Sequence, residues 1–250
     1  MKIVTWNCNG ALRNKFSALD RLDADLLVIQ ECEDPQNYPG VYLDWAGHYL
    51  WVGDNKHKGL GVFARHGNRV SELSWHGKFT LAGLNPLHPN TTWSTADLKL
   101  FLPSKVNDDL SILAVWTKGS KSEVFRYIGQ LWKYIQIHKN ELAMPNTLII
   151  GDLNSNAIWD KKDRWWSHSG VVAELSELGI HSLYHHARQE EQGAEKEPTF
   201  FLQRNLNRAY HIDYAFMSAD LLARSTLDIG LQETWLTLSD HLPLMITITP

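Results

Sequence analysis

Short apolar runs recur along the whole chain and alternate with amphipathic stretches, and this pattern limits the fold more than any other feature. Runs typical of strands cover residues 3–8, 26–30, 60–64, 98–101, 111–116, 147–150, 214–217 and 244–249. Apolar residues at helical spacing cover residues 16–22, 121–140 and 171–178. Strands and helices that alternate in this way predict an α/β protein whose strands are covered on one face by helices.

Two of the predicted helices carry terminal signals. Ser122 is placed as the N-cap of the longest one, residues 121–140, and Gly179 follows the helix predicted for residues 171–178. A side-chain hydroxyl favours a helix start, and glycine favours a helix end, because each satisfies backbone groups that the helix leaves unpaired.

The loops predicted between these elements indicate one domain. Residues 85–90 are rich in turn formers, and residues 188–197 are hydrophilic without an apolar anchor, which predicts a solvated surface loop. The strand pattern resumes at residues 199–201, directly after that loop. We therefore expect residues 1–250 to form a single domain rather than two domains joined by a linker.

Net charge and cysteine content limit which ligands the protein attracts and in which cellular compartment we expect it. The 250 residues carry 24 Lys and Arg against 28 Asp and Glu, a formal net charge of −4, so a polyanionic substrate needs a local basic patch or a bound cation. Cys8 and Cys32 are too few for a disulfide framework and fit reduced, buried positions. No apolar run approaches the roughly 20 residues that span a bilayer. We expect a soluble cytoplasmic protein, and a monomer.

Polar residues interrupt the chain at the ends of the predicted strands. Five motifs share this position: Trp6-Asn7-Cys8-Asn9-Gly10, Gln30-Glu31, Gly151-Asp152-Leu153-Asn154, His211-Ile212-Asp213-Tyr214 and Ser239-Asp240-His241-Leu242-Pro243. Strand termini gather at the rim of a sheet, where binding and catalytic sites are commonly built.

The first group of these residues suits a hard metal ion. Glu31 and Asp240 offer carboxylate oxygens, and Asn7 offers an amide oxygen, which are the ligands that Mg²⁺ prefers. No Cys/His cluster has the spacing of a zinc site. The sequence therefore favours Mg²⁺ or Mn²⁺ over zinc.

The second group suits proton transfer and anion binding. Asp152 and Asn154 are two residues apart, so on an extended segment both project to the same side. One can take a proton from water while the other donates a hydrogen bond to an anionic oxygen. His241 titrates near neutrality, and Asp213 can orient its imidazole. Together with a cation, this set suits hydrolysis of a phosphate ester.

Taken in chain order, the five motifs resemble those of the endonuclease/exonuclease/phosphatase superfamily, the DNase I-like group that includes exonuclease III-type nucleases. The resemblance extends from Trp6 to Pro243. It implies a four-layer α/β sandwich, with two packed mixed β-sheets flanked by helices, and Mg²⁺-dependent hydrolysis of phosphoesters. It also implies a nucleic acid, DNA or RNA, as the substrate.

The resemblance assigns roles to residues of this chain. Glu31 would be the principal metal ligand, with Asn7 and Asp240 on the metal or its waters and Asn9 joining them. A second set would carry the catalysis: Asp152 would align or deprotonate the attacking water, Asn154 would hold the phosphate, and His241, paired with Asp213, would stabilise it.

One position departs from the family pattern. Many relatives place a His or Tyr after the strand at residues 111–115, whereas this chain has Trp116, whose indole offers only an N–H donor. Either Lys118 or a metal-bound water takes that role, or the leaving group departs with less help. Trp159 and Trp165 flank a charged segment and are candidates for stacking on bases.

Alternatives remain open on these residues. Singly, each motif also fits a turn, a surface carboxylate or a buried histidine. The chain also fits a phosphatase or phosphodiesterase of a small phosphorylated metabolite, or a non-catalytic nucleic-acid-binding protein on the same fold. A glycosidase with paired carboxylates is a further alternative, and it would need no metal. Endonuclease and exonuclease modes are not distinguished by these motifs.

Overall fold

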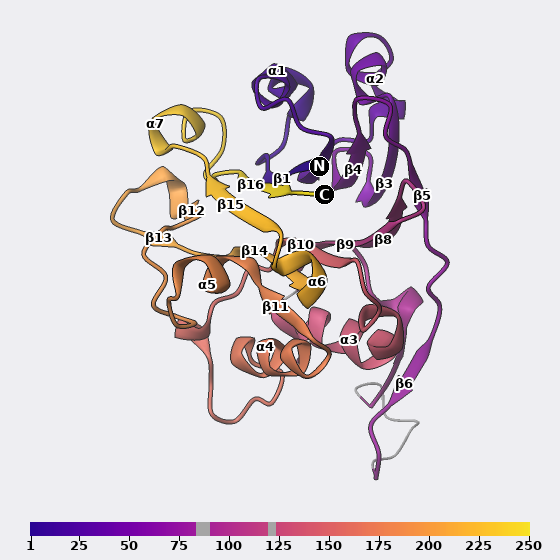
Figure 1. Ribbon diagram of the computed structural model, residues 1–250, viewed down its shortest axis with the longest axis vertical. Helices are drawn as coiled ribbons and strands as arrows, with labels where there is room; N and C mark the ends of the chain where they lie inside the picture. Colours follow the sequence, from indigo (N-terminus) through magenta and orange to yellow (C-terminus); the bar gives the residue numbers. More distant parts are fainter. Residues whose placement is uncertain (84–90, 120–123) are drawn as a thin grey trace.

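The computed structural model describes residues 1–83, 91–119 and 124–250, and it contains two six-stranded sheets packed face to face (Figure 1). The predicted loop at residues 85–90 and the predicted cap Ser122 lie outside the described residues. The first sheet has the order β15-β16-β1-β2-β4-β3, with the bounds Ser225–Ile229, Leu244–Ile248, Lys2–Asn7, Leu26–Cys32, Lys58–Ala64 and His48–Asn55.

The second sheet has the order β11-β14-β10-β9-β8-β5. Its strands are Ile180–Ser182, Asp213–Ser218, Thr147–Asp152, Leu110–Trp116, Phe101–Val106 and Val70–Glu72. Two small ribbons, β6 with β7 and β12 with β13, cover Lys78–Thr80, Thr92–Ser94, Phe200–Phe201 and Ala209–Tyr210. In each large sheet one central pair is parallel, β1 with β2 and β9 with β10, and the other pairs are antiparallel, so both sheets are mixed.

Buried residues on both faces of the central strands explain their continuous apolar sequences. In β1, Ile3 points into the core between the sheets, whereas Val4 points to the opposite face. In β10, Ile150 points into the same central core and Ile149 points outward. Neighbouring side chains of a strand alternate between its faces, so a strand buried on both sides needs apolar residues at every position.

Helices cover the two outer faces. One outer face is packed by α1, α2 and α7, which span Phe16–Asp20, Val41–Ala46 and Gln232–Trp235. The other is packed by α3 (Ile128–Leu142) and α4 (His168–Glu177), which lie side by side (Figure 1). Two further helices, α5 (Leu183–Arg188) and α6 (Ala219–Leu222), contribute apolar residues to the core between the sheets. The predicted four-layer α/β sandwich is confirmed.

Several predicted bounds were wrong. The helix predicted for residues 121–140 begins only at Ile128, because Tyr127 before it has a φ of 53°. The strand predicted for residues 98–101 begins at Phe101, because a 3₁₀ turn at Thr95–Asp97 and a φ of 61° at Leu100 precede it. The short edge strands and the hairpin strand β3 were not predicted.

The hydrophilic stretch 188–197 is held by charged side chains. Glu195 is almost wholly buried, and its carboxylate accepts hydrogen bonds from His185 Nε2 at 3.1 Å and Asn156 Nδ2 at 3.0 Å. Arg188 pairs with Glu197 across the same loop. The loop has no apolar anchor, as its sequence indicates, and a polar anchor holds it instead.

The structure also shows the state of the cysteines and whether any described helix could span a membrane. Cys8 and Cys32 are buried and form no disulfide, as predicted. Among the helices of the described residues, none has the length and apolarity that a membrane crossing requires.

Candidate active site

The central strands of the two sheets end beside each other, and their last residues meet. Asn7 ends β1 and Asp152 ends β10, and Asn7 Nδ2 donates a hydrogen bond of 2.9 Å to Asp152 Oδ2. Gly151, directly before Asp152, allows β10 to lie close to β9. It has a φ of 143°, and a Cβ there would lie 2.0 Å from the carbonyl oxygen of Val115. A larger residue at this position would displace β10, and Asp152 with it.

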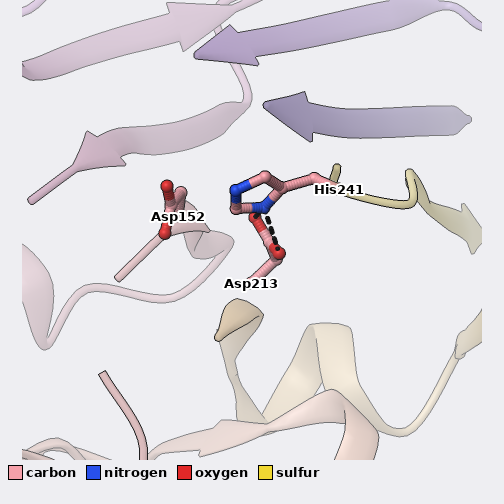
Figure 2. Close-up of side chains that lie close together, drawn as sticks. All are labelled: Asp152, Asp213 and His241. Carbon is pink, nitrogen blue, oxygen red and sulfur yellow. Dashed lines mark hydrogen bonds and ion pairs between the residues drawn. The ribbon is translucent and has the colours of Figure 1, made fainter. Parts of the chain in front are cut away.

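Asp152, Asp213 and His241 form a compact cluster (Figure 2). Pairing of β10 with β14 places Asp152 directly opposite Asp213. His241 Nδ1 bonds to Asp213 Oδ2 at 2.9 Å and to Oδ1 at 3.2 Å. Each of the three offers one polar atom within 4.8 Å of the others, and their exposed fractions are 0%, 2% and 5%.

Burial and charge shift the proton affinity of this cluster. Burial raises the pKa of Asp152 to about 7, and the nearby charge of Asp213 adds to that effect. Burial opposes the charged form of His241, but the carboxylates of Asp213, Asp152 and Asp240 outweigh it and raise the imidazole pKa to about 9. Near neutral pH the cluster therefore holds a protonated histidine beside a carboxyl group that can gain or lose a proton.

Asn154 is fixed against Asp152 by two hydrogen bonds. Its backbone N–H donates to Asp152 Oδ1 at 2.8 Å, and its side-chain Nδ2 donates to Asp152 Oδ2 at 2.9 Å. Nδ2 also donates to the carbonyl oxygen of Thr117 at 3.1 Å. Asn154 has a φ of 45°, in the left-handed region. Such strained conformations persist where surrounding contacts hold them, and they are frequent at functional sites.

Glu31 lies on the more open side of the same site. It occupies a β-bulge in β2 with a φ of 63°, and Asn7 Nδ2 lies 3.5 Å from its Oε1. The ammonium group of Lys58, the first residue of β4, forms an ion pair with Oε2 of Glu31. The exposed fractions of these two side chains are 19% for Glu31 and 49% for Lys58. A cation therefore already faces this carboxylate.

The segment that carries His241 is tied to the end of β1. Ser239 Oγ donates to the carbonyl oxygen of Asn7 at 2.7 Å, and Trp6 Nε1 donates to the carbonyl oxygen of His241 at 3.0 Å. Asp240 lies between them, and its carboxylate is 3.5 Å from Ser239 Oγ. Asn9 donates its backbone N–H to Asn7 Oδ1 at 3.0 Å.

The other predicted contact residues have different surroundings. Trp116 is buried, and Lys118 Nζ lies 4.4 Å from its ring centroid. Trp159 is 47% exposed and packs 5.0 Å from Tyr210, measured between ring centroids. Trp165 is exposed but leans against Trp166. Of these, Trp159 lines a pocket that Asn154 also lines.

Thr199 is a site residue that the sequence did not reveal. Its Oγ1 donates to Asp213 Oδ2 at 2.7 Å and accepts the backbone N–H of Asp213 at 3.1 Å. It therefore holds the carboxylate that binds His241. A threonine directly after a proline carries no catalytic signal in the sequence, because its role depends on a contact across 14 residues.

The layered fold is that of the DNase I-like class of phosphoric ester hydrolases. A model of the endonuclease/exonuclease/phosphatase family matches residues 4–241, and the chain therefore belongs to this family. It is a hydrolase that acts on phosphoric esters. The family that the five motifs indicated is confirmed.

Solved structures agree on the fold. A 3′–5′ exonuclease from Neisseria meningitidis is 21% identical, with a TM-score of 0.69, and a 3′ phosphatase from Neisseria bound to a product DNA hairpin is 19% identical, with a TM-score of 0.70. An AP endonuclease from Archaeoglobus fulgidus is 18% identical, with a TM-score of 0.64. Each comparison covers 100% of both chains. No curated protein sequence matches significantly.

Proposed function

We propose that the protein is a Mg²⁺- or Mn²⁺-dependent phosphodiesterase that hydrolyses nucleic acid. The observation that carries this proposal is the buried arrangement of Asp152 beside the Asp213–His241 pair. A carboxyl group with a pKa near neutrality is suited to accept a proton, and a histidine with a raised pKa is suited to stabilise an anion.

The residues divide the proton chemistry between them. Asp152 accepts a proton from the attacking water as the new P–O bond forms. His241 keeps its Nδ1–H on Asp213, and Figure 2 shows its other ring nitrogen turned towards Asp152. That second N–H donates to a phosphoryl oxygen. The scissile P–O bond then breaks, and the leaving oxygen takes its proton from solvent, because the indole of Trp116 cannot supply one.

The donor set fits a hard divalent cation. Glu31 already holds the cationic group of Lys58, Asn7 Nδ2 lies 3.5 Å from Glu31 Oε1, and Asp240 follows Ser239, which bonds to the backbone of Asn7. Asp152, Asp213 and His241 also lie close enough to ligate, but the two carboxylates already accept hydrogen bonds from Asn7, Asn154, Thr199 and His241, and the proposed chemistry uses His241 on the phosphate. We therefore assign the metal to Glu31, with Asn7 and Asp240, and with Asn9 beside them. When bound, the ion would neutralise charge on the phosphoryl oxygens.

Support for a nucleic acid comes from the similar solved structures. One similar structure is described as an exonuclease, and another is bound to a DNA hairpin.

We further propose that residues 1–250 act as one domain, because the core between the sheets draws on residues from Ile3 to Ile248.

The test is hydrolysis of a small aryl phosphodiester and of labelled DNA and RNA, with Mn²⁺, with Mg²⁺ and with EDTA. We expect turnover with either metal and none with EDTA. Because one neighbour is described as a 3′ phosphatase, strands ending in a 3′ phosphate are included. Release of that phosphate without strand cleavage would favour a phosphomonoesterase. Binding of DNA without any turnover would overturn the proposal in favour of a non-catalytic binding protein.

A further inference from the structure

A pocket of about 280 Å³ opens beside the catalytic cluster, and Asn154 forms part of its wall. Its other walls come from the start of α3 and from the loop that joins β10 to α4. Asn154 also bonds to Asp152, so the pocket is continuous with the place where the scissile phosphate would lie. We call it the Asn154 pocket.

The charges of the Asn154 pocket favour an anion. Arg126, Lys161 and Arg164 line it, and none of them has an ion-pair partner in the part of the chain that the structure describes. The one acidic residue of the lining, Asp160, is already engaged. Its two carboxylate oxygens accept the backbone N–H groups of His168 at 2.7 Å and Ser169 at 2.9 Å, at the start of α4.

This local charge contrasts with the whole molecule. The chain carries a net charge of −4, so its overall field repels polyanions. The three cations of the pocket, which have no ion-pair partner among the described residues, provide the local attraction that such a substrate requires.

Aromatic side chains are exposed around the same pocket. Trp159 is 47% exposed and Tyr127 is 41% exposed, and both line it. Of the nine large hydrophobic side chains that are exposed among the described residues, five lie on the two flanking segments, residues 124–127 and 158–165. Large apolar side chains that gather at one exposed place mark a binding surface. Aromatic faces beside cations are the recognition chemistry of unpaired nucleotides.

We propose that the Asn154 pocket binds the nucleotide next to the scissile phosphate in a single-stranded segment. Its phosphate lies on Arg126, Lys161 and Arg164, and its base stacks on the exposed face of Trp159. A base inside a duplex has both faces covered by its neighbours, so only an unpaired base can use this surface. This inference rests on the proposed function, because it takes the scissile phosphate to lie at Asp152 and His241, next to Asn154.

The first experiment measures binding without turnover. A short labelled single strand, the same sequence as a blunt duplex, and inorganic phosphate as competitor are tested with wild-type protein in EDTA by fluorescence anisotropy. We expect the single strand to bind more tightly than the duplex. Trp159→Ala should weaken single-strand binding about 5- to 100-fold, the range for loss of one base stack. Arg164→Ala should reduce the slope of log affinity against log salt by about 1.

Two exposed residues outside the pocket provide controls. Val41→Ala removes an exposed apolar side chain on α2, and Lys162→Ala removes a cation between Lys161 and Arg164, but neither residue lines the pocket. Both variants should bind the single strand as wild type does. Trp159→Phe keeps an aromatic face and should recover most of the affinity lost in Trp159→Ala.

Turnover separates this inference from the proposed function. Trp159→Ala and Arg164→Ala should lower the ratio of single-strand cleavage to aryl phosphodiester hydrolysis at least about tenfold, because the small diester has no second nucleotide. If the wild type hydrolyses both substrates and this ratio is unchanged in the variants, or if duplex binds more tightly than single strand, the inference is overturned while the proposed function stands. If nothing is hydrolysed but the variants still lose single-strand affinity, the proposed function fails and the pocket is retained as a binding site.

Discussion

The two sheets supply side chains to the same site, but the carboxylates from the second sheet are more deeply buried than the one from the first. The second sheet supplies Asp152 and Asp213, which are buried, and with His241 they form a preassembled hydrogen-bonded cluster. The first sheet supplies Glu31 and, in the ion pair with it, the half-exposed Lys58. Asn7 connects the two sides, because its one amide nitrogen lies within 3.5 Å of both Asp152 and Glu31.

The difference in burial suits the two sides of the site to two tasks, proton transfer and metal binding. Proton transfer needs groups whose pKa values are shifted, and burial among charges shifts them. Metal binding needs carboxylate oxygens that remain open to an ion and its waters. We expect changes on the buried side to abolish chemistry or to move its pH dependence, and changes on the open side to alter metal affinity.

The largest effect is expected from Asp152→Asn. This change keeps the shape of the side chain but removes the proton acceptor, so kcat should fall by at least about 10³-fold. Burial penalises the charged form of Asp152, but the amide nitrogen of the variant faces a donor that the carboxylate accepted, so the two effects oppose each other and stability at pH 8 should stay close to that of wild type. Thermal unfolding and turnover of the aryl phosphodiester measure the two effects. Asp108→Asn, at an exposed position, is the control. Residual turnover near the wild-type rate would remove Asp152 from the chemistry.

The next effect is on the pH profile. Wild-type kcat/KM should rise as Asp152 loses its proton near pH 7 and fall as His241 loses its proton near pH 9. Asp213→Asn keeps an oxygen that accepts the Nδ1–H but removes the charge, so the alkaline limb should move down by at least about one pH unit, with about a 10²-fold loss of rate. Asp228→Asn, at an exposed position on β15, should leave both limbs in place. An unmoved alkaline limb in Asp213→Asn would show that His241 does not produce it.

The ion pair between His241 and Asp213 also makes the stability of the fold depend on pH. The folded-state pKa of His241 lies above its ordinary value of 6.5, so the pair stabilises the fold fully below about pH 6.5. That contribution is lost as the pH rises through about 9. Wild-type stability should therefore fall more steeply over this interval than the stability of Asp213→Asn.

The fold and most of the site could be predicted because their signals are local. A strand buried on both faces shows as a continuous apolar run, and a polar residue at its end, such as Asn7 or Asp152, shows where the sheet edge lies. Glu31 was found through its position after such a run, although the bulge that turns its backbone to a positive φ has no sequence signal.

The remaining contacts depend on distant partners. Lys58 meets Glu31 across 27 residues, and Thr199 meets Asp213 across 14. Nothing in the sequence near either residue shows which group it will face. The polar anchor of the loop 188–197 could not be predicted for the same reason, since the partners of Glu195 come from α5 and from the segment after β10.

A smaller effect, on stability alone, is expected from Glu195→Ala. The change leaves His185 Nε2 without its acceptor and removes one of the acceptors of Asn156 Nδ2, which still bonds to the carbonyl oxygen of His211, so it should cost about 1–3 kcal/mol in the free energy of unfolding. Burial opposes ionisation of Glu195, but its hydrogen bonds outweigh burial and lower its pKa to about 2. Its contribution is therefore present above about pH 4.5 and is lost as the pH falls towards 2.

Denaturant titrations at pH 7 and at acid pH measure this contribution. Glu191→Ala, at an exposed position of the same loop, is the control and should cost little at either pH. Equal losses in the two variants would show that the Glu195 carboxylate does not anchor the loop. Asn156 follows Asn154 by two residues, so a modest fall in kcat alongside the loss of stability would show that the anchor also supports the buried side of the site.

The smallest effect is expected on the open side, from Lys58→Met. The Lys58 ammonium and a divalent ion compete for the same carboxylate, so removing the ammonium should tighten Mn²⁺ binding. Because both side chains are partly exposed, the ion pair stabilises by about 0.2–1 kcal/mol, and affinity should rise only about two- to fivefold. Calorimetric titration of Mn²⁺ measures this without turnover. Lys56→Met, two residues earlier and outside the ion pair, should leave affinity unchanged, whereas Glu31→Gln should weaken it. If Lys58→Met binds Mn²⁺ no more tightly than wild type while Asp152→Asn binds it far more weakly, the metal belongs to the buried side and the proposed division between the two sheets is wrong.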